Sequence, residues 1–395
     1  MKKNYKLELI RGIAALAVLF THLRNVVPYI NSKDHGFFIN LISSWGTEAV
    51  IVFFILSGIV IYLSYEKKRY SSGAFLKNRL LRLVPGAWIG VGMGLIAARF
   101  TGYHPSAATI AGNLLFTGTL DGFITPILVT NGPLWSLSFE MAFYIFFIFM
   151  VIKWKNINAW LILSILCCPI YLFLSPQMAQ FSGILTQLLW TMTFSLFFLM
   201  GIYVYRFRSR FRVSLSIGLL FLTLFMMPAR FYFDTAVFDL YKFLGMSLVL
   251  LPLFLHCVSN PDEPADGPVY KIGLPHFFVV YAIYVILYWR LNKSLFSSSL
   301  LYSFTPLCCF ILYFFRRFAA RMVDKAETPI AYVSKVLGKL SYGIYIFHYP
   351  LILILAAFLP QSMMLLYFVT IVSVFALAWL LEYKLQPAIN KLFNR

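Results

Sequence analysis

Long apolar runs, separated by short polar connections, most strongly limit what this chain can fold into. A helix needs about 20 apolar residues to cross the hydrocarbon core of a bilayer, so runs of this length predict an all-α bundle of membrane-spanning helices. The ninth run begins with Pro275 and His276, and it and the tenth are the weakest, so we expect 10–12 spans. The runs cover residues 7–30, 45–65, 83–100, 133–152, 157–175, 183–205, 213–229, 240–258, 274–290, 299–315, 340–359 and 362–383.

The composition excludes a soluble, disordered or fibrous chain. Hydrophobic residues make up 61% of the sequence and charged residues 12%, against roughly 45–50% and about 25% in soluble globular proteins. A soluble domain of this composition would lack the charge that covers a surface in water. The net charge of +19 does not indicate nucleic-acid binding, because membrane proteins concentrate Lys and Arg in their cytoplasmic loops.

The distribution of basic residues predicts the orientation in the membrane. When connections are assigned alternately to two sides, one side holds 25 of the 33 Lys and Arg residues, the other holds 7, and Arg11 lies inside the first run. The positive-inside rule assigns the richer side to the cytoplasm. Both ends of the chain belong to that side, so we expect both termini in the cytoplasm.

The connections leave no room for a second domain. We expect residues 1–395 to form a single integral membrane domain, with no fused extracytoplasmic domain and no cleavable signal peptide. The longest outer connection, 101–132, is expected to cap the bundle or to dip into it. The cysteines lie inside apolar runs without the spacing of a metal site, so no metal is expected; they are Cys167, Cys168, Cys257, Cys308 and Cys309.

Ionisable residues within the runs are the first candidates for a functional site, because a charge inside a bilayer is costly. Arg11 and His22 are 11 residues apart in the first run. In a helix they lie within about 20° of one face and about 16 Å apart along the axis, so this face links the cytoplasmic side to the outer half of the membrane. Pairing of Arg11 with Glu8 or headgroups, and an interfacial role for His22, would explain both residues without chemistry.

Glu140 is the candidate acidic partner of His22. It lies seven residues after Pro133, where the fourth run begins at its outer end, and therefore about 10 Å into the helix. A carboxylate beside an imidazole orients the ring and stabilises its charged form, and such a pair is suited to activating a hydroxyl. A packing hydrogen bond from Glu140 to Ser136 or Trp135 is the alternative.

Arg79 and Arg82 form a candidate phosphate site at the cytoplasmic start of the third run. Residues three apart share a helix face, and with Lys77 they make a basic patch suited to phosphate oxygens. The alternative is a cluster that only sets topology or contacts anionic lipid. Two other positions are candidates to support the site: His348 in SYGIYIFHYP and Ser57 in FFILSGIV. For Ser57 the alternative is that a small residue only lets two helices pack closely.

Five segments in this order resemble the acyltransferase-3 family of integral membrane enzymes. The resemblance extends from residue 7 to residue 351, although residues 155–335 match only as apolar spans, and the usual family core has fewer spans. The segments are LELIRGIAALAVLFTH with Arg11 and His22, EAVIVFFILSGIVI with Ser57, FLKNRLLRLVP with Arg79 and Arg82, LWSLSFEMAFY with Glu140, and LGKLSYGIYIFHYPL with His348.

The resemblance implies an O-acyltransferase of the bacterial inner membrane. Its donor would be a cytoplasmic acyl-coenzyme A, usually acetyl-coenzyme A, and its acceptor a carbohydrate such as lipopolysaccharide O-antigen, peptidoglycan or exopolysaccharide. It implies His22 as the catalytic histidine, Glu140 as its acidic partner, and Arg79 and Arg82 near the donor phosphates, and we place Arg11 with them. Any helper would be a separate periplasmic protein. Supporting residues would be Ser57, Trp135, Ser136, Tyr345 and His348.

The sequence hypothesis is transfer across the membrane. The donor tail extends between Arg11 and His22, a sugar hydroxyl enters from outside, and His22 acts as general base; direct transfer and an acyl-enzyme intermediate both stay open. A proton-coupled secondary transporter is the alternative, although the chain has no inverted repeat and a carrier does not need the Arg-x-x-Arg of Arg79 and Arg82. A non-catalytic scaffold would leave the buried ionisable residues unexplained. The acceptor, the acyl chain and the oligomeric state are not specified by the sequence.

Overall fold

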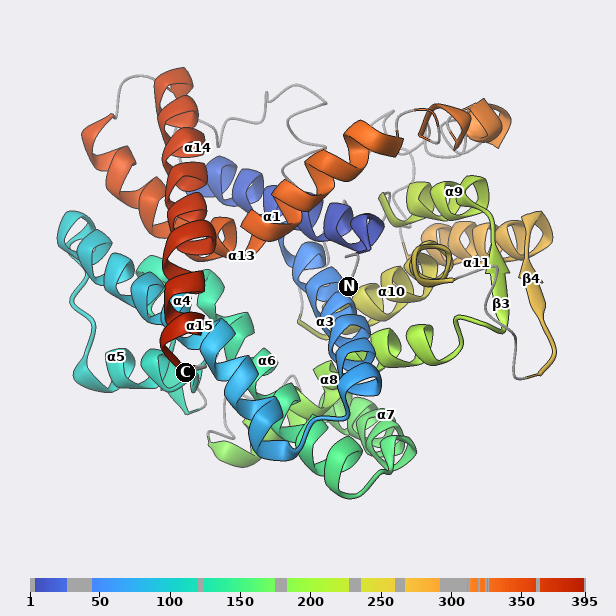
Figure 1. The fold of residues 1–395 in the computed structure, drawn as a ribbon, viewed down its shortest axis with the longest axis horizontal. Coiled ribbons are helices and arrows are strands. Elements are labelled where there is room, and N and C mark those ends of the chain that lie inside the picture. The colour runs from blue at the N-terminus through green and yellow to red at the C-terminus, as the bar shows by residue number, and fades with distance from the viewer. Residues whose placement is uncertain are drawn as a thin grey trace. The chain divides into compact units, whose positions relative to one another are not determined.

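A computed structural model gives the fold of residues 4–26, 45–119, 124–174, 183–226, 236–259, 267–291, 311, 313–318, 320–323, 325, 327–359 and 363–393. These residues are helical apart from short connections and two pairs of very short strands, which confirms the all-α fold class (Figure 1). Contacts divide the chain into two units. Unit 1 comprises Met1–Leu9 and Gly201–Lys335, and unit 2 comprises Ile10–Met200 and Val336–Arg395.

Unit 2 contains every candidate site residue predicted from the sequence. Its helices are α1 (Tyr5–Val26, from Ile10 onward), α3 (Gly46–Lys68), α4 (Ser72–Thr101), α5 (Ala107–Leu114), α6 (Trp135–Phe147), α7 (Ile157–Leu174), α8 (Ile184–Arg206, up to Met200), α13 (Glu327–Phe358, from Val336 onward), α14 (Met363–Trp379) and α15 (Gln386–Phe393). A 3-10 turn, η2 (Val129–Leu134), precedes α6, and the π-helical turns η3 (Ile148–Lys153) and η6 (Leu380–Leu385) follow α6 and α14. The strands β1 (Gly118–Thr119) and β2 (Thr125–Pro126) pair in parallel.

The described part of unit 1 includes a short parallel strand pair and the helices that follow each of its strands. The strand β3 (Phe211–Val213) pairs with β4 (Tyr270–Ile272), with Phe211 opposite Tyr270. The helices are α9 (Leu215–Met226), α10 (Ala236–Val258) and α11 (Leu274–Leu291). The first residues of α1 also belong to this unit.

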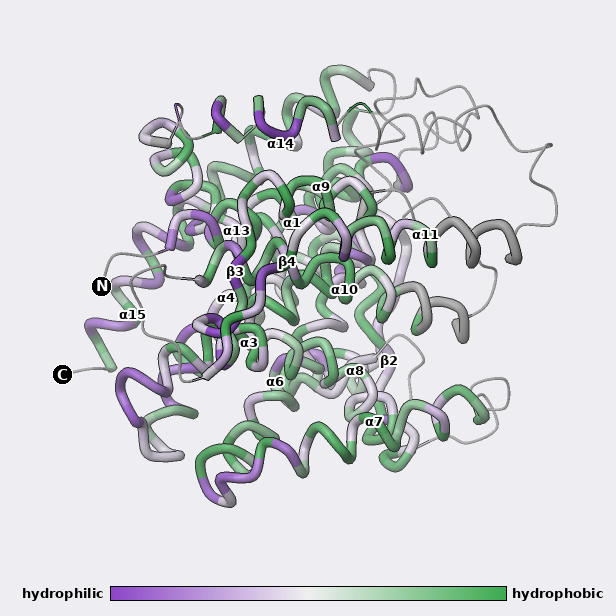
Figure 2. The backbone as a smooth tube through the Cα atoms, turned by 90° about the vertical axis from the view of Figure 1, so that its right-hand side faces the viewer, coloured by the Kyte–Doolittle hydropathy of each residue, from purple (hydrophilic) through white to green (hydrophobic). Residues whose placement is uncertain are grey.

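Seven helices among the described residues are long and apolar enough to cross a membrane. Figure 2 shows hydrophobic residues along most of the length of helices such as α7 and α8. Eleven of the predicted runs fall on helices of the structure. Most of the tenth, 299–315, lies outside the described residues. The helix of the third run begins at Ser72, earlier than predicted, so Arg79 and Arg82 lie within α4 and not in a loop before it.

Helices α1 and α13 run parallel and approach closely. A Cβ atom added to Gly12 would lie 2.6 Å from Cβ of Leu337, and near the other end His22 contacts His348. Lipid tails are as apolar as the side chains of a helix, so the hydrophobic effect does not drive helices together inside a membrane. They associate instead through close packing at small residues. Gly12 therefore sets how near the two helices lie.

Helix α4 also runs parallel to α13, again through glycines. A Cβ atom at Gly86 would lie 2.5 Å from Cε1 of Tyr342, and one at Gly90 would lie 2.7 Å from Cγ2 of Ile346. The predicted spans that contain α1, α4 and α13 are the first, third and eleventh. In a chain that crosses a bilayer repeatedly, all odd-numbered spans run in the same direction. The parallel packing of these three helices is therefore consistent with the predicted order of spans.

An aromatic face on α6 fixes the rotation of that helix. Phe139, Phe143 and Phe147 are four residues apart and so lie on one face. This face packs edge-to-face or tilted against Phe54 of α3 and against Trp190, Phe194 and Phe198 of α8, with ring centroids 5.1–6.3 Å apart. Glu140 follows Phe139 by one residue and lies about 100° further round the helix, away from the aromatic face.

The connection 101–132 packs into the bundle, which is one of the two arrangements predicted for it. Asn131 is fully buried at 0% exposure. Its amide donates to the carbonyl of Gly90 on α4 at 2.9 Å and to that of Ile346 on α13 at 3.2 Å. The connection therefore ties together the two helices that the glycines bring close.

We expect Gly343→Ala to destabilise the fold. The added methyl group would lie 2.6 Å from Cα of Ala378 on α14, and a backbone atom can yield only if the helices separate. Overpacking of this kind costs about 1–3 kcal/mol, so Tm in detergent should fall. Gly92→Ala is the control, because no atom lies within 4 Å of its added methyl and alanine favours a helix. Equal Tm values for the two variants would contradict the packing assignment.

Candidate functional site

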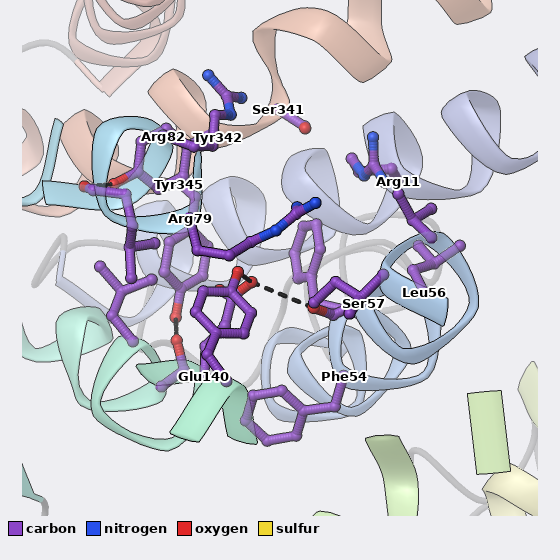
Figure 3. A pocket seen from close by; sticks show the side chains of 17 residues that line it. Arg11, Phe54, Leu56, Ser57, Arg79, Arg82, Glu140, Ser341, Tyr342 and Tyr345 are labelled. Atoms are coloured by element: carbon purple, nitrogen blue, oxygen red, sulfur yellow. Dashed lines mark hydrogen bonds between the residues drawn. The ribbon is translucent and has the colours of Figure 1, made fainter. Parts of the chain in front are cut away.

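A cavity of about 280 Å³ lies among helices α1, α3, α4, α6 and α13 of unit 2. Its walls combine three arginines, one carboxylate, several hydroxyl groups and apolar side chains. In the view of Figure 3, the arginines lie along the upper side and Glu140 lies below them. The polar lining residues are Arg11, Ser57, Arg79, Arg82, Ser136, Glu140, Tyr144, Ser341, Tyr342 and Tyr345.

Arg79 brings a positive charge and an unused hydrogen-bond donor, its Nε–H group, into the cavity. Its Nε atom is buried and has no hydrogen-bond partner among the residues that the structure describes, and its guanidinium carbon lies 5.5 Å from the ring centroid of Phe75, one turn earlier on α4. A buried donor without an acceptor costs about 1–3 kcal/mol. An oxygen atom of an anionic ligand would remove that cost, so Arg79 suits a phosphate group.

Arg82 is held by a carboxylate that the sequence hypothesis did not include. Its Nη1 atom donates to Oε2 of Glu382 at 2.8 Å, and the Glu382 side chain is only 3% exposed. The guanidinium also lies over the ring of Tyr342, at 5.0 Å from the centroid. Glu382 belongs to the π-helical turn η6, and π-helical turns often occur at functional sites. Arg82 is therefore fixed in direction, whereas Arg79 keeps a vacant donor.

Glu140 accepts hydrogen bonds from two hydroxyl groups. Ser57 Oγ on α3 donates to Oε1 at 3.2 Å, and Tyr144 donates to the same oxygen from one turn further along α6. Neither Ser136 nor Trp135 is its partner, and the structure gives no hydrogen bond between Glu140 and His22. The predicted direct pairing of this carboxylate with an imidazole is therefore absent among the described residues.

Tyr345 lies between the cavity and the histidines. Its hydroxyl donates to the carbonyl of Pro133 at 2.6 Å and lies 2.7 Å from Oγ of Ser136. Its ring centroid is 5.9 Å from that of His348. Tyr345 and Ser136 line the cavity as predicted supporting residues, whereas Trp135 packs on Phe139 at 5.5 Å and is not a lining residue.

His22 and His348 form a pair next to Tyr345, and neither histidine is among the residues that line the cavity. Nε2 of His348 lies 3.2 Å from Nδ1 of His22, and the ring centroids are 5.0 Å apart. His348 is fully buried, at 0% exposure. His22 also packs edge-to-face against Tyr349, with centroids 5.1 Å apart. The pair follows from the parallel packing of α1 on α13, which brings the two histidines to the same depth.

Backbone carbonyls fix the protons on both rings. Nδ1 of His22 lies 2.9 Å from the carbonyl of Val18, and Nδ1 of His348 lies 2.8 Å from that of Tyr345. A carbonyl oxygen only accepts, so each Nδ1 carries the proton. The single Nδ1–H of His22 is then shared between the carbonyl of Val18 and Nε2 of His348. This leaves the Nε2 lone pair of His22 as the basic site of the pair.

The described residues contain no group of three or more His, Cys, Asp or Glu side chains that would hold a metal ion. Cys167, Cys168 and Cys257 are free thiols. Cys308 and Cys309 lie outside the described residues.

Comparisons with known proteins give one family and one partial relative. A family model described as an acyltransferase domain (acyltransferase-3) matches residues 4–383. The exopolysaccharide production protein ExoZ of Rhizobium meliloti (strain 1021) is 29% identical over 120 residues, which is 28% of this chain and 37% of that protein. The match thus spans little more than a third of that relative. No solved structure matches.

We expect Arg82→Ala to lower stability more than Arg79→Ala. The first change leaves the buried Glu382 without its cation, and breaking a buried ion pair from one side costs about 3–5 kcal/mol; partial exposure of Arg82, at 40%, reduces that figure. Among the described residues, Arg79 forms no ion pair of this kind, so its removal leaves no buried carboxylate uncompensated. The Arg82→Ala/Glu382→Gln double variant should recover part of the lost Tm. A double variant less stable than Arg82→Ala would disprove the pairing.

Proposed function

Because the chain belongs to the acyltransferase-3 family, we propose that it is a membrane O-acyltransferase that uses a cytoplasmic acyl-coenzyme A. The acyl group, acetyl in the simplest case, passes to a hydroxyl of a cell-surface or lipid-linked polysaccharide on the outer side. The observation that carries this proposal is the vacant, buried Nε donor of Arg79, in a cavity whose wall includes Tyr345, which also contacts the ring of His348.

The donor end of the site is the arginine side of the cavity. Arg79 and Arg11 contact the phosphate groups of coenzyme A, and Arg82, directed by Glu382, supports them. Guanidinium groups suit this role because their planar fork matches phosphate oxygens. The charge pattern of the sequence assigns this end of α4 to the cytoplasm, where coenzyme A is available.

The reacting end lies further along α13. Tyr342 contacts Arg82, and His348 follows Tyr342 by six residues, which is about 9 Å along a helix. An extended pantetheine arm spans that distance. Tyr345 lies halfway along it, with its hydroxyl held by Pro133. The thioester therefore approaches the histidines while its phosphates stay with the arginines.

The chemistry assigned to the pair is general base catalysis. The acceptor hydroxyl oxygen attacks the thioester carbonyl carbon as Nε2 of His22 takes the hydroxyl proton. The carbon–sulfur bond then breaks, and the imidazolium returns the proton to the leaving thiolate. His348 positions His22 by accepting from its Nδ1–H. An imidazole is suited to both transfers because its ordinary pKa lies near neutrality.

Glu140 has a supporting acidic role in this arrangement. Its carboxylate is held by Ser57 and Tyr144 and shares the cavity with Arg79. It fixes the hydroxyl groups along the path of the acyl chain, and it balances part of the charge of the arginines. Its effect on His22 is indirect.

The acceptor is proposed from the relative. The similarity to an exopolysaccharide production protein supports a polysaccharide hydroxyl, and we extend the proposal to lipid-linked sugars and O-antigen. The predicted orientation puts His22 in the outer half of the membrane and the acceptor outside. Incubation of the purified protein with radiolabelled acetyl-coenzyme A and a panel of glycans tests the whole proposal; solute uptake coupled to protons, without transfer, would support a carrier.

We expect Arg79→Ala to weaken coenzyme A binding at least about tenfold, because a charged hydrogen bond contributes about 1.5–3 kcal/mol. Arg79→Lys should recover only part, since lysine lacks the planar fork. Equilibrium dialysis at several salt concentrations measures this, and the variant should show the weaker salt dependence. Arg99→Ala is the control, because Arg99 lies on the same helix but does not line the cavity. If Arg79→Ala binds like the parent, the donor site lies elsewhere.

We expect His22→Ala to reduce acyl transfer by a factor of about 10²–10⁴, the usual contribution of a general base, with coenzyme A binding retained. His348→Ala should reduce kcat less, and His348→Gln should recover part of that loss, because an amide oxygen accepts from Nδ1–H of His22. Single-turnover transfer from radiolabelled acetyl-coenzyme A measures these rates. Near-normal transfer by His22→Ala would refute the assignment of the base.

A further inference from the structure

A second cavity, of about 640 Å³, lies wholly within unit 1 and has a strongly basic lining. Its volume falls within the range of small-molecule sites, about 300–1,000 Å³. Five cationic side chains line it, from α1, β3, β4 and the segment before α13. They are Lys6, Arg212, Lys271, Arg316 and Arg317, and the described lining residues include no carboxylate.

A histidine holds one of these cations in place. Nδ1 of His256 lies 2.8 Å from the carbonyl of Val213 on β3, so this nitrogen carries the proton. Its Nε2 atom then accepts a hydrogen bond from the ammonium of Lys6 at 3.2 Å. Asn4 donates to the carbonyl of Cys257 at 2.6 Å and secures the start of α1 on α10. Lys6 is therefore directed by a built hydrogen-bond network.

Two helices begin at the same cavity. Ser214 precedes α9, accepts a hydrogen bond from the backbone N–H of Ile217 at 3.4 Å and lies 3.0 Å from Oγ of Ser216. Gly273 and Leu274, at the start of α11, also line the cavity. The N-terminus of a helix carries partial positive charge, which adds to that of the five cations. Serine hydroxyls and backbone N–H groups are common donors to phosphate oxygens.

The described residues that line the cavity carry a positive charge. The connection 260–266 lies outside the described residues, and its sequence contains Asp262, Glu263 and Asp266. A cluster of like charges in one cavity costs repulsion, and an anionic ligand removes that cost.

We propose that this basic cavity binds the phosphate group of an anionic ligand, at a site separate from the donor cavity. All five cations belong to the side that the charge pattern assigns to the cytoplasm. The phosphate therefore comes either from the headgroup of an anionic phospholipid in the cytoplasmic leaflet or from a free phosphate compound of the cytosol. The shared chemistry is a phosphate held by arginine, lysine and serine donors.

The first experiment measures binding of radiolabelled pyrophosphate to the full chain in non-ionic detergent by equilibrium dialysis. The Arg79→Ala protein is used, so that the donor cavity contributes little. Arg316→Gln/Arg317→Gln should weaken binding at least about tenfold. Arg321→Gln/Lys325→Gln removes the same charge from the same connection, at residues that do not line the cavity, and should change binding less than about twofold.

The second experiment identifies the source of the phosphate. The protein, with Arg79 intact, is placed in nanodiscs of equal parts phosphatidylglycerol and phosphatidylcholine, and native mass spectrometry counts the lipids that it retains. Retained phosphatidylglycerol that is lost in Arg316→Gln/Arg317→Gln would assign the cavity to a lipid headgroup. Pyrophosphate binding without lipid retention would assign it to a free phosphate compound.

Three results would overturn the proposal. They are absence of both kinds of binding, an equal loss in the Arg321→Gln/Lys325→Gln control, and displacement of bound pyrophosphate by coenzyme A in the Arg79→Ala protein. Coenzyme A binding by Arg316→Gln/Arg317→Gln with Arg79 intact is measured alongside and should be unchanged. If the first pair does not elute as one species in size exclusion, Arg212→Gln/Lys271→Gln replaces it, with the same expected loss.

Discussion

The close packing of α13 against α1 and α4 is the contact on which the site in unit 2 depends. Glycines at Gly12 and Gly86 let the backbones approach, which is how helices associate where no water drives them together. The contact with α1 puts His22 beside His348, and the contact with α4 puts Arg82 beside Tyr342. Packing on α13 therefore positions both the proposed base, His22, and the proposed phosphate-binding residue Arg82.

Some polar groups of the site are held in place by hydrogen bonds to other protein groups, whereas others have no such partner among the described residues. Glu382 directs Arg82, and carbonyls direct the Nδ1 atoms of both histidines, so these groups lose little freedom when a ligand binds. Arg79 Nε and the Nε2 lone pair of His22 are the groups that the proposed function assigns to the ligand and to the reaction. Preorganised groups in a site with few waters act more strongly on a developing charge than the same groups in water.

Sequence reasoning selected the polar residues of the spans but did not predict which of them are neighbours. The long apolar runs correctly predicted the all-α fold, whereas the cavity that Glu140 shares with Arg11, Arg79 and Arg82 is a finding of the structure. Sequence reasoning paired Glu140 with His22 because their depths agree, and it could not know that the aromatic face of α6 turns Glu140 toward Ser57 and Tyr144. Glu382 lies 300 residues from Arg82 in the chain, so the contact between them can be seen only in the folded structure.

The parallel contact of α1 with α13 has a consequence for how the two helices can change. Between Gly12 and His22 there are as many helical turns as between Leu337 and His348, to within one residue. Inserting or deleting a single residue in either stretch would rotate everything beyond it by about 100° and shift it by about 1.5 Å. The imidazoles would then part although every motif residue was still present. Substitutions are therefore tolerated between these points more readily than changes of length, and a compensating insertion in the partner helix is the simplest repair.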